Sequence, residues 1–221
     1  MPLIVFEGID GSGKSTQFRR LAAHMDQAGT PYTRLVFPQY DKPSSALLRM
    51  YLDGAFGADP DAVNPYAAST FYAVDRYASY NRVWGDAYKS GATILADRYT
   101  TSNMVHQGAK VPAADRLQFF RWLDEFEHDL MELPRPDLVL YMDIPIEIAL
   151  ENMRIRQIET NTQADIHEAG EAYLKRCCET ARAATDFFGW HPVPCAANGV
   201  MRPEEEIHRE ILNILSSGYD R

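Results

Sequence analysis

The sequence predicts an α/β fold in which a parallel sheet of about five strands is covered by helices on both faces. Three observations support this prediction: short apolar runs alternate with longer helical patterns, a glycine-rich loop joins the first run to the first helix, and 221 residues can bury a sizeable core. Strands that alternate with helices are connected by right-handed crossovers, which make the sheet parallel. We expect a single domain over residues 1–221.

Five apolar runs are the candidate strands. Residues 2–6 are apolar throughout, which is typical of a strand that is buried on both faces of a sheet. The other runs are YTRLVF at 32–37, ATILA at 92–96, LVLYM at 138–142 and the weaker HPVPCA at 191–196.

Helical patterns fill the gaps between these runs. Spaced apolar residues predict helices at about 14–28, 43–53, 66–89, 114–131, 146–157, 168–188 and 203–216. Pro203 is followed by three glutamates, and this predicts the start of the last helix, because the fixed φ of proline and acidic side chains both suit a first turn.

The glycine-rich loop reads EGIDGSGKST at residues 7–16. Gly8, four residues, and then Gly13, Lys14 and Ser15 match the Walker A pattern, in which backbone amides cradle phosphates and the lysine reaches the β and γ groups. A strand before such a loop and a helix N-terminus after it form an anion site. The sequence therefore predicts a P-loop NTPase-type sheet with a phosphate site at the end of its first strand.

Composition excludes several classes of protein. The content of 46% apolar and 24% charged residues is that of an ordinary globular protein, and the formal charge of −9 argues against nucleic acid as the main partner. The first residues lack a basic leader and break after five apolar positions, so they predict neither a signal peptide nor a membrane span. Three cysteines fit neither a disulfide framework nor a zinc site, which favours a cytoplasmic location.

Two aspartates end candidate strands, where parallel sheets bind their ligands. Asp97 closes ATILAD and Asp143 closes LVLYMD. Either carboxylate could orient magnesium beside the phosphate loop while Ser15 supplies an oxygen, and either could instead be a structural cap. The spacing alone leaves both possibilities open.

A tyrosine and an arginine share one face of the long helix predicted at 66–89. Tyr72 and Arg76 are four residues apart, so one ring and one guanidinium could receive the base and the phosphate of a nucleotide. The alternative is a buried tyrosine with an arginine extended over it.

Residues 153–168 read MRIRQIETNTQADIHE and lack apolar periodicity. A charged segment that faces a phosphate site is a candidate lid, and the alternative is a solvated connector. Phosphoryl transfer spreads negative charge that positioned cations stabilise, and the glycine loop carries no arginine. A lid arginine, Arg154 or Arg156, is therefore the natural source of that cation.

Taken together, the motifs resemble those of thymidylate kinases, which phosphorylate dTMP to dTDP with ATP. The resemblance covers most of the chain and is strongest in GIDGSGKST, FPQY, FYAVDR, ADRYTTSN and the candidate lid. It implies ATP and dTMP as substrates, Mg²⁺ as cofactor and a homodimer. From the composition we expect no nucleic acid or membrane partner and a cytoplasmic location.

The same resemblance implies roles for individual residues. Arg98 would hold the acceptor phosphate, and Asp97 rather than Asp143 would lie in the magnesium environment with Ser15. Catalytic roles would fall to Lys14, Arg98, Arg154 and Asp10. The residues at ATP would be Gly8, Ile9, Asp10, Gly11, Ser12, Gly13, Lys14, Ser15 and Thr16. Those at the substrate nucleotide would be Asp10, Phe37, Tyr72, Arg76, Arg98, Ser102, Asn103 and Gln107.

The chain departs from the family pattern at a few positions. Gln39 stands where members often have arginine, which leaves Lys42 or Arg49 as candidate replacements, and His106 stands where an aromatic ring commonly helps to exclude a ribose 2′ hydroxyl. In the candidate lid, Asp165 and Glu168 match an Asp-x-x-Glu of bacterial members. The stretch CAANG at 195–199 is similar to the loop that flanks the donor adenine, and a plain turn is an equal interpretation.

Other functions are possible for a glycine loop of this kind. A deoxynucleoside kinase would have to deprotonate a 5′ hydroxyl, for which Glu7 or Asp97 could serve as base, but such kinases generally show Asp-Arg-Ser where this chain has Tyr99 as the third residue. A GTP-binding switch would need Asn-Lys-x-Asp, and that tetrapeptide is absent from the sequence. A catalytically silent nucleotide-binding module remains a third alternative.

Overall fold

Five parallel strands form the central sheet. The computed structural model describes residues 2–160 and 170–217. The strands β1 (Leu3–Glu7), β2 (Tyr32–Val36), β3 (Thr93–Asp97), β4 (Leu138–Asp143) and β5 (His191–Pro194) pair in the order β2-β3-β1-β4-β5. The predicted parallel sheet is thereby confirmed. All of β1 is buried, since it lies in the middle of the sheet with a neighbour on each side.

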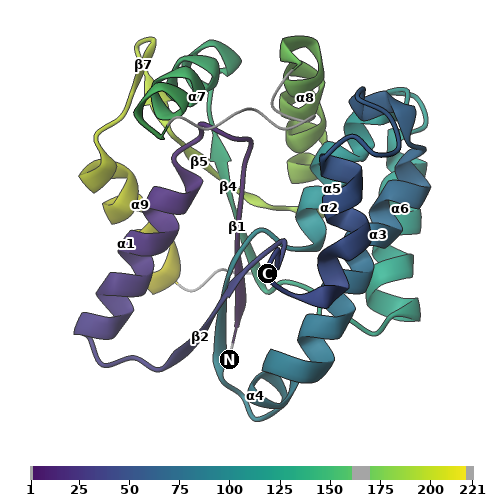
Figure 1. The fold of residues 1–221 in the computed structure, drawn as a ribbon. Helices are drawn as coiled ribbons and strands as arrows, with labels where there is room; N and C mark the ends of the chain where they lie inside the picture. The colour runs from purple at the N-terminus through teal and green to yellow at the C-terminus, as the bar shows by residue number, and fades with distance from the viewer. Residues whose placement is uncertain (1, 161–169, 218–221) are drawn as a thin grey trace.

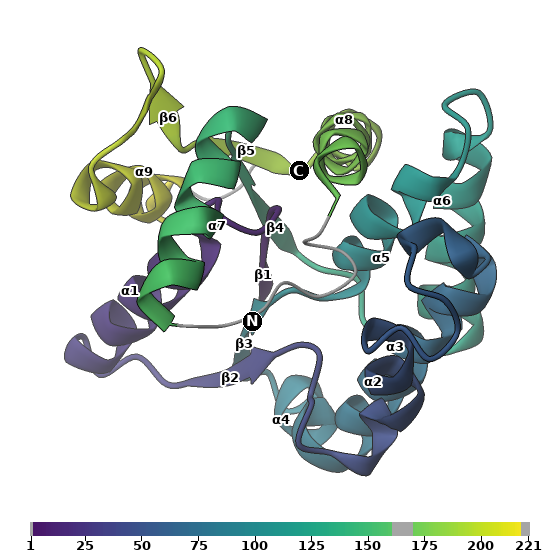
Figure 2. The same ribbon diagram turned by 45° about the horizontal axis from the view of Figure 1, so that its top comes forward.

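Helices cover both faces of the sheet, as predicted. Helices α1, α7 and α9 lie on one side, and α3, α5, α6 and α8 lie on the other (Figures 1 and 2). Their bounds are α1 (Lys14–Gln27), α2 (Ala46–Leu52), α3 (Pro65–Ser79), α4 (Gly85–Lys89), α5 (Thr100–His106), α6 (Arg116–Asp124), α7 (Ile146–Thr160), α8 (Glu171–Phe188) and α9 (Glu204–Ser216). None of the helices within 2–160 and 170–217 is both long and apolar enough to cross a membrane.

The first and last helices pack together against the sheet. Phe18 and Leu21 of α1 are buried, as are Ile207 and Ile211 of α9, so each helix turns an apolar stripe inward. Helix α9 begins directly after Pro203, where the sequence predicted its start.

Two of the predicted helices contain π-helical turns. The helix predicted at 66–89 is divided into α3, the π turn η3 (Tyr80–Trp84) and α4, and the one predicted at 114–131 is divided into α6 and the π turn η5 (Glu125–Leu130). At the end of η3 a side chain on Gly85 would collide with the Tyr80 carbonyl, so glycine permits the wider turn. The remaining short elements are the 3₁₀ turns η1 (Pro43–Ser45), η2 (Pro60–Ala62) and η4 (Gly108–Lys110).

Helix α5 is an element that the apolar pattern did not predict. It is built from TTSNMVH, and threonine, serine and asparagine have low intrinsic helix propensity. Tertiary packing supplies what propensity lacks, because six of its seven side chains are buried, all but Ser102. The helix follows β3 and Arg98 closely, which carries its polar residues to the carboxyl end of the sheet.

The candidate lid at 153–168 differs from the prediction in its first half. Helix α7 continues to Thr160 rather than ending near residue 157, so 153–160 is helical and not a polar connector. Residues 161–169, which include Asp165 and Glu168, lie outside the described part of the chain.

The CAANG stretch forms a hairpin beside the glycine loop. Strands β6 (Ala196–Ala197) and β7 (Val200–Met201) pair antiparallel across Asn198 and Gly199, which have φ of 53° and 77°. An Asn-Gly pair at positive φ is the preferred tight turn of a hairpin. The hairpin brings Met201 against Gly13.

Candidate active site

The glycine loop joins β1 to α1 and depends on glycine at close contacts. Gly11 has φ of 79° and Gly13 has φ of 83°, a region that side chains disfavour. A side chain on Gly11 would collide with the Ala149 carbonyl oxygen of α7, and one on Gly13 would collide with Met201. The loop is therefore held between the start of α1, the helix α7 and the hairpin.

Lys14 and Ser15 both contact Asp97. Lys14 Nζ lies 2.6 Å from Asp97 Oδ1, and the Ser15 hydroxyl donates to Asp97 Oδ2 at 3.0 Å. Burial lowers the pKa of Lys14, the charge of Arg98 lowers it further, and Asp97 opposes both. Asp143 instead pairs with Arg182, so the structure separates the two aspartates that the spacing could not.

A cavity opens in front of the glycine loop, and we call it the donor cavity after the predicted ATP residues that line it. Its lining includes every loop residue predicted at ATP except Gly8, whose N–H donates to Glu7. The lining residues are Ile9, Asp10, Gly11, Ser12, Gly13, Lys14, Ser15, Thr16, Gln17, Arg19, Asn152, Arg156, Met201 and Glu204.

Helix α7 turns one face toward this cavity. Asn152 donates to the Gly11 carbonyl at 2.8 Å, and Arg156, one helical turn further, also lines the cavity. Arg154 lies elsewhere, since its side chain is 74% exposed and pairs with Glu151. The structure thus brings Arg156 to the glycine loop and leaves Arg154, the arginine preferred by resemblance, outside the cavity lining.

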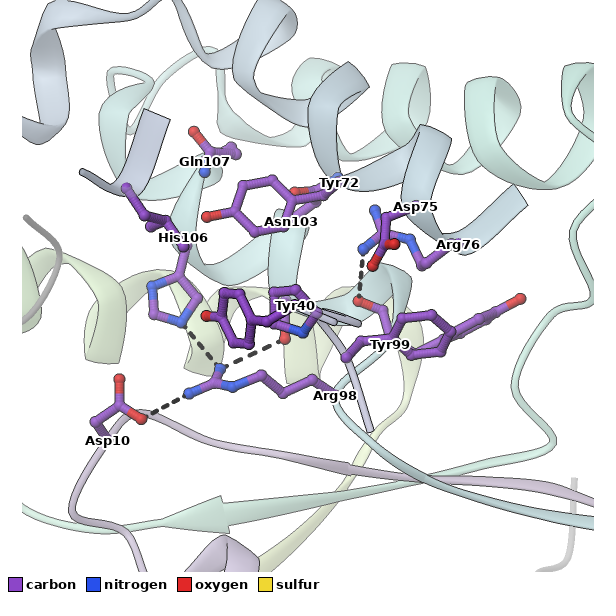
Figure 3. Close-up of a pocket in the computed structure, with 14 residues that line it drawn as sticks. Asp10, Tyr40, Tyr72, Asp75, Arg76, Arg98, Tyr99, Asn103, His106 and Gln107 are labelled. Carbon is purple, nitrogen blue, oxygen red and sulfur yellow. Dashed lines mark hydrogen bonds and ion pairs between the residues drawn. The ribbon is translucent and has the colours of Figure 1, made fainter. Parts of the chain in front are cut away.

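A second cavity, which we call the acceptor cavity after the predicted substrate residues that line it, lies between β3, α3 and α5 (Figure 3). All eight residues predicted at the substrate nucleotide line it. The complete lining is Asp10, Phe37, Pro38, Tyr40, Leu52, Tyr72, Asp75, Arg76, Arg98, Tyr99, Ser102, Asn103, His106 and Gln107. Asp10 belongs to both cavities, so the two sites meet at this residue.

Arg98 lines the acceptor cavity, and its guanidinium contacts Asp10, Glu7 and His106. Its Nη2 lies 2.8 Å from Asp10 Oδ1, and its Nη1 lies 3.5 Å from Glu7 Oε1 and 3.2 Å from His106 Nε2 (Figure 3). Burial opposes the charge on Arg98, but Asp10 and Glu7 outweigh it and raise the pKa of the guanidinium. Burial also disfavours the charged form of Asp10 and so raises its pKa, but the charges of Arg98 and Lys14 outweigh burial and lower the pKa to about 2.

Glu7 is fully buried behind Arg98. It accepts hydrogen bonds from the Thr101 hydroxyl at 2.6 Å, the Ser102 hydroxyl at 2.7 Å and the Gly8 N–H at 2.9 Å. These contacts tie the start of α5 to the end of β1. Glu7 is thereby engaged as a structural acceptor and does not line either cavity.

The FPQY loop is fixed by Asp75 of α3. Asp75 accepts from the Gln39 N–H at 2.8 Å and from the Ser44 hydroxyl at 2.6 Å. Arg49 donates to the Tyr40 carbonyl within the same loop. Lys42 pairs with its neighbour Asp41, and neither Lys42 nor Arg49 lines the acceptor cavity. Tyr40 lines it instead.

Two residues at the inner wall of the acceptor cavity are held by Glu127, which sequence reasoning missed. Arg76 Nε and Nη2 each donate to Glu127 at 2.6 Å, and Asn103 Nδ2 donates to it at 3.0 Å. Glu127 lies in the acidic run EFEHD, which reads as a solvated helix face. Asn152 was also missed. It lies four residues before Arg156, so the two share one helix face, but this could be predicted only if the helix was known to continue past residue 157.

Comparisons with known proteins agree with this geometry. A sequence model of the family described as thymidylate kinase matches residues 6–187. The chain is 30% identical to the thymidylate kinase of Dinoroseobacter shibae over 95% of this chain and 94% of the relative. It is 27% identical to that of Mycobacterium tuberculosis over 85% and 87%, and 26% identical to a probable thymidylate kinase of Thermococcus gammatolerans over 96% and 94%. The chain therefore belongs to the thymidylate kinase family.

Proposed function

We propose that this chain transfers the γ-phosphoryl group of ATP to dTMP, giving dTDP and ADP, by direct transfer between its two cavities. One observation carries the proposal: a Walker A donor cavity and an arginine-bearing acceptor cavity meet at Asp10. Family membership supports the identity of both substrates. One domain over 1–221 carries both cavities, with the region around 153–168 as the lid.

In the donor cavity the backbone amides of the loop residues that line it, within 9–13, hold the phosphates of ATP. Lys14 leaves Asp97 to reach the β and γ groups. Ser15 and Thr16 complete the phosphate contacts. Arg156 supplies the arginine that the glycine loop lacks, because α7 carries it to the wall of the donor cavity.

In the acceptor cavity Arg98 binds the phosphate of dTMP. Tyr72 offers a ring for the base to stack on, and Asn103 and Gln107 read the base edge. Gln107 is fully buried, and neither polar atom of its amide has a hydrogen-bond partner within 2–160 and 170–217. Such an orphaned amide at a cavity wall fits a ligand that supplies both a donor and an acceptor.

The residues present fit a magnesium ion. Ser15 Oγ and the Asp97 carboxylate lie 3.0 Å apart at the phosphate loop, and oxygen atoms are the ligands that Mg²⁺ prefers. Ser15 and Asp97 would hold the ion together with phosphate oxygens. When bound, Mg²⁺ neutralises phosphate charge at the site of transfer.

The chemistry requires alignment more than proton transfer. The attacking phosphate oxygen of dTMP is largely ionised near neutral pH, so no buried base is needed, and Glu7 is already engaged by three donors. Arg98 orients the attacking oxygen, and Lys14 and Arg156 stabilise the charge that develops on the transferred group.

A coupled assay of ADP release tests the proposal. With ATP and Mg²⁺ we expect release with dTMP and little with thymidine, dCMP or GMP. ADP release with thymidine but not with dTMP would identify a deoxynucleoside kinase and refute the proposal.

We further propose a homodimer in the cytoplasm. Helix α3 exposes Tyr66, Val74 and Tyr77 by 40–49%, which provides an apolar surface for a second copy, and the three free buried cysteines suit a reducing compartment. Sedimentation should give twice the 25.1 kDa chain mass. A monomer at micromolar concentration would refute the dimer.

A further inference from the structure

Glu127 is a buried carboxylate that the reaction scheme does not use. It lies on η5 and has no exposed surface. Its Oε2 accepts from Arg76 Nε and its Oε1 from Arg76 Nη2, both at 2.6 Å, so the two side chains form a bidentate pair. A carboxylate that faces a guanidinium through both oxygens accepts hydrogen bonds and donates none.

The Asn103 amide is held in one orientation by this carboxylate. Asn103 Nδ2 donates to Glu127 Oε1 and to the Ser69 carbonyl oxygen, each at 3.0 Å. Both partners are acceptors only, so a turned amide would place its oxygen against two other oxygens. The atom that Asn103 can offer to the cavity is therefore Oδ1, a hydrogen-bond acceptor.

A fixed acceptor distinguishes the two common pyrimidines. N3 of thymine carries a hydrogen, whereas N3 of cytosine carries a lone pair that Oδ1 would repel. The remaining N–H groups of Arg76, which also lines the cavity, can donate to a carbonyl at C4 of thymine but not to the amino group of cytosine. A site built to pair with one edge rejects the other, because its buried polar groups would be left unpaired.

We propose that Glu127 is the positioning residue that sets the choice of pyrimidine, by holding the Asn103 amide as an acceptor and the Arg76 guanidinium as a donor. This inference rests on the proposed function and deepens it. Glu127 itself does not contact the nucleotide, since Arg76 and Asn103 stand between it and the cavity.

Glu127→Gln tests the proposal, because its new NH₂ group can donate to Asn103 Oδ1 and leaves the Ser69 carbonyl as the one acceptor that still opposes a turned amide. We expect the ratio of kcat/KM for dTMP to that for dCMP to fall about tenfold or more, while KM for ATP stays unchanged. Glu125→Gln is the matched control, since Glu125 is an exposed glutamate on the same turn, and it should keep the ratio of the unaltered protein. An unchanged ratio in folded Glu127→Gln would overturn the proposal.

A second measurement uses the unaltered protein, because Glu127→Gln leaves Arg76 without its buried partner and can prevent folding. The side-chain NH₂ protons of Asn103 can be followed by NMR, with their signals assigned by their loss in Asn103→Ala. These protons should exchange slowly with solvent both without and with dTMP. Protection that arises only when dTMP is added would overturn the proposal. Lack of any activity on dTMP would refute the proposed function itself, whereas normal dTMP activity with rapidly exchanging Asn103 protons would refute only the role of Glu127.

Discussion

Arg98 and Asp10 form an ion pair, with Nη2 lying 2.8 Å from Oδ1, at the point where the donor and acceptor cavities meet. The pair joins the segment after β3 to the glycine loop, which are 88 residues apart in the sequence. An arginine held in this way keeps its orientation before any phosphate arrives, so little reorganisation is needed on binding.

Removing the charge of Asp10 should therefore disturb the position of Arg98. We expect Asp10→Asn to lower kcat/KM for dTMP by about 100-fold, a cost typical of a misplaced binding group. Steady-state kinetics at saturating ATP measure the effect, and Asp53→Asn, an exposed aspartate after α2, serves as the control. Normal kinetics in Asp10→Asn would show that Arg98 is oriented without its partner.

Lys14 should stabilise the phosphoryl group during transfer, so its removal should lower the rate of transfer rather than the stability of the fold. Lys14→Ala is expected to lower kcat by at least about 100-fold, the scale on which one positioned charge stabilises a transition state. The exposed Lys175→Ala should retain full activity. If Lys14→Ala turned over at a near-normal rate, the lysine would have no role in transfer.

The two arginines of α7 provide an internal comparison. Arg156 lines the donor cavity and Arg154 points to solvent, so Arg156→Ala should reduce kcat by about 100-fold while Arg154→Ala changes it less than threefold. Both variants remove the same side chain from the same helix. The reverse ranking, measured with dTMP and ATP, would support Arg154 as the catalytic cation.

The depressed pKa of Asp10 should appear in acid stability. The pKa of Asp10 is about 2 in the folded protein and 3.8 ordinarily, so its charged form adds about 2 kcal/mol to the free energy of unfolding. This contribution is fully present above pH 5 and is lost as pH falls through 3.8 toward 2. Urea unfolding at several pH values measures this. The stability difference between the unaltered protein and Asp10→Asn should shrink on acidification, and a difference independent of pH would contradict the assignment.

The sheet could be predicted because buried parallel strands are marked by composition alone. Helix α5 could not, since Thr100, Thr101 and Asn103 favour caps and turns and become helical only through burial among other elements. The π turns could not be predicted either, because one extra residue in a helical turn leaves the spacing of apolar residues almost unchanged.

The residues of the site were found more readily than the contacts that position them. Asp10 and Arg98 lie in short motifs, whereas Glu127 lies 51 residues from Arg76 in a run that resembles a solvated surface. Arg156 was separable from Arg154 only once α7 was known to continue as a helix, since Asn152 and Arg156 then share the face toward the glycine loop.

Transfer between the two cavities is tested most directly by following the label from [γ-³²P]ATP in the presence of dTMP and Mg²⁺. Direct transfer predicts that the label appears in dTDP at its terminal phosphate, in equal amount to the ADP formed. Label found only in inorganic phosphate, or label that appears in dTMP when thymidine replaces dTMP while dTMP itself is not phosphorylated, would contradict the account.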